Sequence, residues 1–176
     1  GRLLACQHEN VRPDGVILGK ALGGGLLPVA AFLADDALMQ VFQPGDHGST
    51  FGGNPLAAAV AAEALALLAE ERLAERSAAL GARFLARLQA IDNPFIREVR
   101  GRGLMIGMEL DTRRAPARVA AEWMLARGLM TKDTHEKVLR FAPPLIVSEA
   151  ELEWAATTIE DALTDLARRF PSGDTP

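Results

Sequence analysis

The spacing of hydrophobic residues divides the chain into a first part of short strands and loops and a second part of helices and alternating strands. Apolar runs at 16–18 and 29–33 predict two strands, and the segment between them, GKALGGGLLP, is rich in glycine. Small apolar residues over 55–70 predict a helix that Asn54 would cap. Apolar residues with a period near 3.6 predict a second helix over 73–91.

The second part changes to alternating strands and further helices. Segments 95–99 and 104–110 predict strands on either side of the sequence RGRG, and alternate residues of the second strand are apolar. A helix over 116–127, closed by a glycine, and a short strand over 138–141 follow. Residues 148–151 have the S-x-x-E pattern of a capping box, which predicts the start of a last, amphipathic helix.

The change of pattern near residues 66 to 72 predicts a boundary between two packing units. The sequence begins with Gly1, without an initiator methionine or a signal-peptide core, so we expect a fragment of a longer chain. The last six residues, PSGDTP, are expected to fray.

Composition and charge exclude several classes of protein. Hydrophobic residues make up 49% and charged residues 24%, as in globular proteins, and no apolar stretch reaches the roughly 18 residues of a membrane span. A net charge of -4 without basic blocks argues against nucleic-acid or membrane partners. The single cysteine, Cys6, fits a reducing compartment such as the cytoplasm. His8, His47 and His135 lie far apart, so no metal site is predicted.

Lys20 is the first candidate for chemistry, because it directly follows a predicted strand and precedes the glycine run 23–25. If that strand is buried, Lys20 approaches apolar surroundings, where the neutral amine is favoured over the ammonium. A neutral lysine can attack a carbonyl group. A phosphate-loop role fails, because Asp14 and Ala21 stand where a Walker A sequence needs glycine and serine or threonine. A surface lysine at a strand end is the alternative.

Two further segments carry candidate binding residues. HGSTFGGNP offers the hydroxyls of Ser49 and Thr50, glycine amides and a helix start, a combination that suits an anion. The alternative is a turn that only caps the helix. LRFAPPL places Arg140 at a strand end before the rigid pair 143–144, where a guanidinium can bind a carboxylate through two hydrogen bonds. An exposed strand arginine is the alternative there.

Four motifs follow one another along the chain: LGKALGGGLLPV, HGSTFGGNPLA, VRGRGLMIGMEL and LRFAPPL. Together they resemble the class III, pyridoxal-phosphate-dependent aminotransferases over essentially the full length of the chain. The resemblance implies an α/β transferase of fold type I. Residues 1–70 would form the C-terminal part of the large cofactor domain with its connecting helix, and residues 71–176 the α+β small domain.

The resemblance also implies a role for each candidate residue. Lys20 is the catalytic lysine, which binds the aldehyde of pyridoxal 5'-phosphate covalently and then moves protons as general base and acid. Thr50 is expected to bind the cofactor phosphate of the neighbouring subunit in a homodimer or higher homo-oligomer. Ser49 is expected near the cofactor and the substrate. Arg140 is expected to hold the α-carboxylate of 2-oxoglutarate or glutamate.

The family's remaining cofactor-binding parts are expected upstream of Gly1. They are a glycine-rich phosphate loop, an aromatic residue that stacks on the pyridine ring and an aspartate that pairs with the ring nitrogen. Without that aspartate the ring cannot act as an electron sink, so the fragment alone is expected to be inactive.

Within the family, RFAPPL favours enzymes that move the δ-amino group of ornithine to 2-oxoglutarate, giving glutamate 5-semialdehyde and glutamate. The lysine and Ser-Thr motifs are shared across the class, so acetylornithine or another ω-amino acid is the alternative donor. A non-catalytic interaction protein derived from the same fold is a third possibility. The presence of Lys20, Thr50 and Arg140 together argues against it.

Overall fold

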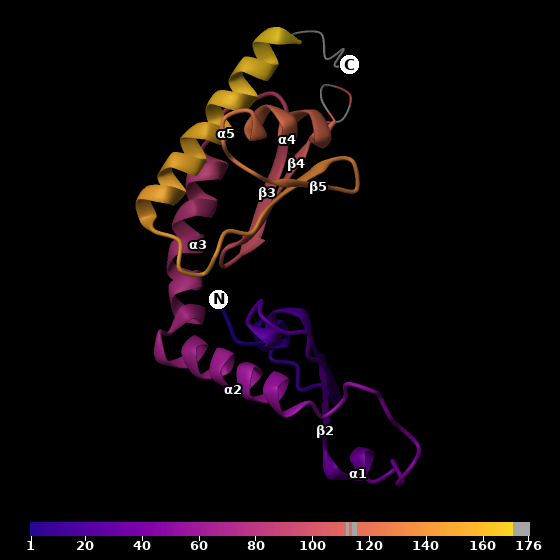
Figure 1. Cartoon of the computed structure of the whole chain (residues 1–176). Coiled ribbons are helices and arrows are strands. Elements are labelled where there is room, and N and C mark those ends of the chain that lie inside the picture. Colours follow the sequence, from indigo (N-terminus) through magenta and orange to yellow (C-terminus); the bar gives the residue numbers. More distant parts are fainter. Residues whose placement is uncertain (112, 114–115, 171–176) are drawn as a thin grey trace. The chain divides into compact units, whose positions relative to one another are not determined.

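The computed structural model describes residues 1–111, 113 and 116–170, and the chain divides into two compact units (Figure 1). One unit consists of residues 2–72, and the other consists of Gly1 and the residues from Leu73 onward. The predicted frayed tail, PSGDTP, lies outside the described residues.

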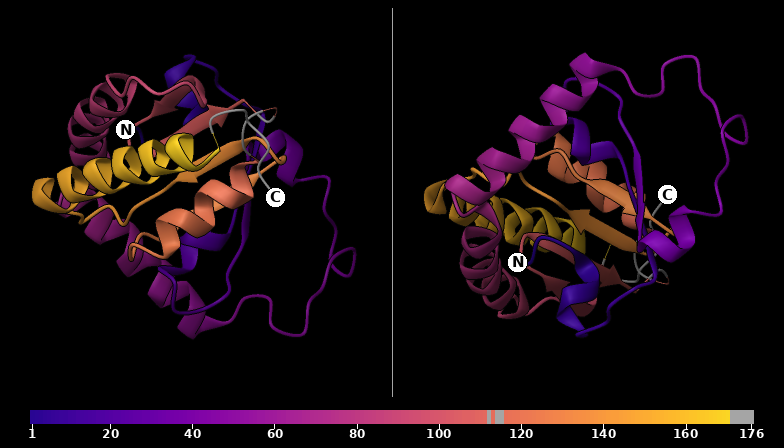
Figure 2. Two further views of the ribbon diagram at one scale, coloured as in Figure 1. Left: turned by 90° about the horizontal axis from the view of Figure 1, so that it is seen from above. Right: turned by 90° about the horizontal axis from the view of Figure 1, so that it is seen from below.

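The second unit is built on a four-stranded antiparallel sheet. Its strands lie in the order β3-β4-β6-β5, with β3 at Ile96–Arg102, β4 at Met105–Leu110, β5 at Lys132–Thr134 and β6 at Val138–Phe141. Three helices cover one face of this sheet (Figure 2). They are α3 at Leu73–Gln89, α4 at Ala117–Leu125 and α5 at Glu149–Arg169.

The core of this unit lies between the helices and the covered face of the sheet. Ile106, Met108 and Leu110 of β4 are at most 1% exposed, which confirms the predicted alternation. Leu139 and Phe141 of β6 lie opposite Met108 and Ile106, and they are buried on the same face. The residues between them therefore point to the other face of the sheet.

The helix α5 begins at the predicted capping box. The Ser148 hydroxyl accepts a hydrogen bond from the Glu151 amide at 3.2 Å, and the Glu151 carboxylate accepts one from the Ser148 amide at 2.8 Å. The hydrogen bonds that Glu151 accepts from Ser148 lower the pKa of its carboxyl group.

Neither α5 nor any other helix of the described residues is long and apolar enough to cross a membrane.

The second glycine of RGRG, Gly103, lies in a tight turn close to a helix. Gly103 has a φ of 55° in the turn between β3 and β4, a backbone conformation that side chains disfavour. A Cβ atom on Gly81 of α3 would come within 2.1 Å of the Gly103 backbone, so helix and turn approach closely. The Ser77 hydroxyl fixes this approach by accepting a hydrogen bond from the Leu104 amide at 3.1 Å.

The first unit contains a two-stranded antiparallel sheet and a long helix. Its elements are the 3-10 helices η1 at Ala5–His8 and η2 at Lys20–Gly23, the strands β1 at Gly15–Leu18 and β2 at Ala31–Ala34, and the helices α1 at Asp36–Met39 and α2 at Pro55–Glu70. The predicted cap of α2 is confirmed, because Asn54 Oδ1 accepts hydrogen bonds from the amides of Leu56 and Ala57.

This unit has little hydrophobic core of its own. Its buried hydrophobic residues are Ala57 and Ala61, whereas Ile17 and Phe51 are 81% and 82% exposed. The prediction that the strand before Lys20 is buried is therefore wrong within this chain. The physical reason is that two strands alone cannot cover both faces of their own sheet.

Candidate active site

Lys20 opens the short helix η2 in an unfavourable backbone conformation. Its φ is 50°, in the left-handed region that costs an ordinary residue about 1 to 2 kcal/mol. Glycine, which adopts this conformation freely, stands directly before it at Gly19 and again at 23–25. Residues held in such conformations gather at functional sites. The Lys20 side chain is exposed within this chain, and its amine has no partner among the described residues.

The helix α2 supports the turn that follows Lys20. Gly24 has a φ of 61°, and a Cβ atom placed on it would lie 3.3 Å from the Cβ of Ala64. The small residues of α2 therefore allow it to pack closely against η2. This contact holds the backbone that carries Lys20.

Ser49 and Thr50, the two predicted hydroxyl residues in the loop before α2, differ in their hydrogen bonds. Ser49 Oγ accepts a hydrogen bond from the Gly52 amide at 3.1 Å, so Ser49 stabilises the turn. Asn54 occupies the first amides of α2, which removes them as ligands for an anion. The Thr50 hydroxyl is exposed and has no partner within the described part of the chain. No hydrogen bond among the described residues joins Lys20 to Ser49 or Thr50.

Arg140 lies in the other unit, on the face of the sheet that the helices leave uncovered. Its neighbours Leu139 and Phe141 are buried under the helices, so the pleat of β6 turns Arg140 outward. Thr131 Oγ1 donates a hydrogen bond to the Arg140 carbonyl at 3.0 Å, which fixes the backbone here. The guanidinium of Arg76 on α3 donates to the carbonyls of Leu145 and Val147 and so holds the segment after Pro143–Pro144.

An open groove of about 460 Å³ lies against this uncovered face, and Arg100, Arg102 and Arg140 line it. Arg100 binds Glu98 at 2.6 Å and Glu109 at 3.2 Å, so its charge is neutralised. A hydrogen bond from Lys137, with a further one from Arg100, lowers the pKa of the Glu109 carboxyl group. By contrast, the guanidinium of Arg140 has no partner among the residues that the structure describes. Arg140 is therefore available to bind an anion.

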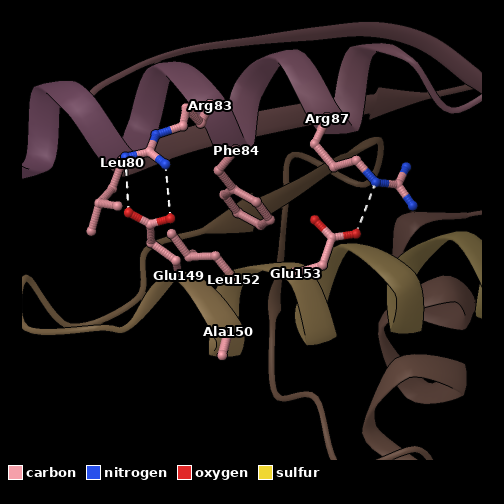
Figure 3. Close-up of a pocket in the computed structure, with 8 residues that line it drawn as sticks. All are labelled: Leu80, Arg83, Phe84, Arg87, Glu149, Ala150, Leu152 and Glu153. Atoms are coloured by element: carbon pink, nitrogen blue, oxygen red, sulfur yellow. Dashed lines mark hydrogen bonds and ion pairs between the residues drawn. The ribbon is translucent and has the colours of Figure 1, made fainter.

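A second pocket, of about 380 Å³, lies between α3 and α5, and its charged residues bind one another (Figure 3). Arg83 and Glu149 form two hydrogen bonds of 2.8 Å each. Arg87 binds Glu153 at 3.2 Å, and the same guanidinium binds Glu160 of α5 at 2.6 Å. These ion pairs join the two helices. Because they leave no free charge for a ligand, the pocket is not a candidate active site.

The described ranges contain no cluster of metal ligands. No group of three or more histidine, cysteine, aspartate or glutamate side chains is placed there to hold a metal ion.

The sequence pattern did not predict the strand β5, which places Lys132 beside Arg140. Its three residues, KDT, have no apolar alternation, so the sequence carried no signal for it.

Comparison with known proteins identifies what the chain is similar to. The family model of the class III aminotransferases matches residues 1–163. An ornithine aminotransferase of Bacillus cereus is 53% identical over 164 residues, which are 93% of this chain and 41% of that protein. The chain thus spans less than half the length of this relative.

Solved structures of the same class share the fold. The ornithine delta-aminotransferase of Plasmodium falciparum superimposes with a TM-score of 0.92 and 39% identity, over 96% of this chain and 44% of that one. An acetylornithine aminotransferase of Elizabethkingia anophelis gives a TM-score of 0.87 and 40% identity, over 93% of this chain and 42% of that one.

The left-handed backbone at Lys20 gives a prediction about stability. In the cofactor-free, full-length protein that contains this chain, Lys20→Gly should be more stable than Lys20→Ala by about 0.5 to 1 kcal/mol, because glycine relieves the strain that alanine keeps. Chemical denaturation of both variants measures the difference in the free energy of unfolding. A Lys20→Ala variant as stable as Lys20→Gly would show that the position is not strained.

Proposed function

This chain belongs to the class III aminotransferases, and we propose that the full-length protein containing it transfers the δ-amino group of ornithine to 2-oxoglutarate. The products are glutamate 5-semialdehyde and glutamate. The 53% identity to a bacterial ornithine aminotransferase supports ornithine as the donor. Acetylornithine is the alternative donor, because the two solved structures above differ little in identity to this chain. The observation that carries the proposal is Lys20 itself, whose exposed amine follows β1 on a left-handed backbone with a φ of 50° and has no partner among the described residues.

The side chains of this chain suit pyridoxal 5'-phosphate in their chemistry. Lys20 offers an amine, Thr50 a hydroxyl and Arg140 a guanidinium, each without a partner in the part of the chain that the structure describes. When bound, pyridoxal phosphate supplies an aldehyde and an electron-withdrawing ring that stabilises negative charge on the substrate carbon. Lys20 would hold it through the amine nitrogen. The same nitrogen, once displaced by the amine of the substrate, would remove a proton from carbon and return it at a second atom.

The remaining candidate residues are proposed to bind the cofactor and to orient the substrate. Thr50 would donate its hydroxyl hydrogen to the cofactor phosphate of the neighbouring subunit, in a homodimer or higher homo-oligomer. Ser49 would lie near the cofactor and substrate, and its hydroxyl keeps a hydrogen to donate while its oxygen accepts from Gly52. Arg140 binds the α-carboxylate of 2-oxoglutarate or glutamate through two parallel hydrogen bonds.

The single cysteine supports a location in the cytoplasm.

Covalent trapping tests the role of Lys20. The chain has three lysines, Lys20, Lys132 and Lys137, so peptide mapping distinguishes them. Borohydride reduction of the full-length protein with pyridoxal phosphate should fix the cofactor on Lys20, and Lys20→Ala should abolish the label. The matched variant Lys137→Ala should keep it, because Lys137 is bound to Glu109. Label on any other lysine would contradict the assignment.

The dissociation constant of the cofactor tests the role of Thr50. Thr50→Val keeps the shape of the side chain and removes one hydrogen bond to a charged acceptor, worth about 1.5 to 3 kcal/mol, so cofactor affinity should fall by roughly tenfold or more. Thr157→Val, at an exposed position of α5, is the matched control and should change nothing. Equal affinities for Thr50→Val and the wild type would rule out the phosphate contact.

Separate half-reactions test the role of Arg140. Arg140→Lys keeps the positive charge but loses the two-point geometry, so the half-reaction with 2-oxoglutarate should lose about 2 to 5 kcal/mol, or roughly 30-fold or more. The half-reaction with ornithine should lose less. Single-turnover absorbance changes measure each half, with Arg118→Lys on α4 as the control. Equal losses in both halves would mean that Arg140 supports the fold instead of binding the dicarboxylate.

A further inference from the structure

The uncovered face of the four-stranded sheet carries a row of basic residues in register. Arg100 of β3 lies opposite Gly107 of β4, and Gly107 lies opposite Arg140 of β6. On the other side of Arg140, the residue in register is Lys132 of β5. These four positions, which we call the cationic row, share one face, because residues in register across a sheet point the same way.

Two neighbours in the cationic row have uncompensated charge. Side chains directly opposite in an antiparallel pair have Cβ atoms about 4.5 to 5.5 Å apart, and like charges there destabilise the sheet. Arg140 and Lys132 are such a pair. Neither side chain has a partner among the described residues, whereas Lys137 on the adjoining turn is bound to Glu109 at 3.1 Å.

The acidic groups nearby are already engaged. Glu109 binds Arg100 and Lys137, and Glu98 binds Arg100. Asp133 alternates with Lys132 along β5 and lies 3.7 Å from the guanidinium of Arg118 on α4, which packs against the covered face. No carboxylate of the described residues therefore relieves the repulsion between Arg140 and Lys132.

The groove beside the cationic row has room for a small anion. Its volume of about 460 Å³ lies within the range of small-molecule sites. Gly107 leaves the floor open between Arg100 and Arg140, and a Cβ atom there would approach Val138 Cγ1 to 3.3 Å. A carboxylate bound to Arg140 would lie within reach of the long, flexible side chain of Lys132.

We propose that Lys132 is a second cation of the carboxylate site and binds, together with Arg140, the carboxylate of the 2-oxo acid acceptor. This inference rests on the proposed function, which places that carboxylate at Arg140. Arg140 supplies the two-point geometry, and Lys132 supplies a point charge from the neighbouring strand. The anion in turn removes the repulsion between the two cations.

Equilibrium binding of glutarate, an unreactive dicarboxylate, to the full-length holoenzyme tests the proposal without turnover. Lys132→Gln should weaken glutarate binding by about three- to tenfold, and Lys132→Arg should restore most of it. The control Lys137→Gln, on the same hairpin, should leave the affinity unchanged. Without glutarate, Lys132→Gln should be at least as resistant to thermal unfolding as the wild type, because one of two repelling charges is gone.

The outcomes separate this inference from the proposed function. Loss of affinity in Lys132→Gln alone supports the second cation, even if the wild type fails to convert ornithine, a failure that would overturn the proposed function only. Unchanged affinity in Lys132→Gln, equal losses in Lys132→Gln and Lys137→Gln, or no glutarate binding by the wild type would each overturn the inference. A lower thermal stability of Lys132→Gln without ligand would assign Lys132 to the fold and overturn it as well.

Discussion

Burial of alternate residues of β4 and β6 under three helices is the constraint on which the candidate carboxylate site depends. Leu139 and Phe141 must face the helices, so the pleat of the strand turns Arg140 to the opposite face. A slip of one residue in register would bury the guanidinium and expose the two apolar side chains. The packing of the core therefore fixes the direction in which Arg140 points, before any ligand binds.

The two units differ in how far they are stabilised by their own residues. The unit from Leu73 onward has a continuous core and ion pairs between α3 and α5. The unit 2–72, which carries Lys20 and Thr50, exposes large apolar side chains such as Ile17 and Phe51. Apolar surface of this extent calls for further protein against it. That need agrees with a chain that spans 41% of the length of its bacterial relative.

Local signals in the sequence predicted most of the fold. The Asn54-Pro55 pair marked the start of α2, and the capping box marked the start of α5, because both act through adjacent backbone amides. The short strand β5 was not predicted, because its pairing with β6 and not its own pattern holds it in place. Lys20 and Arg140 were predicted as site residues from the sequence. The pairing of Lys132 with Arg140 and the left-handed backbone at Lys20 were not predicted, because neither has a local signal in the sequence.

The amino donor that the full-length protein prefers distinguishes ornithine transfer from its alternative. The full-length protein, supplied with pyridoxal phosphate and 2-oxoglutarate, is given ornithine or N-acetylornithine at equal concentrations, and kcat/KM is measured from the glutamate formed. Ornithine should give the higher kcat/KM, with glutamate 5-semialdehyde as the second product. A higher kcat/KM for N-acetylornithine, or no glutamate from either donor, would overturn the proposed transfer from ornithine.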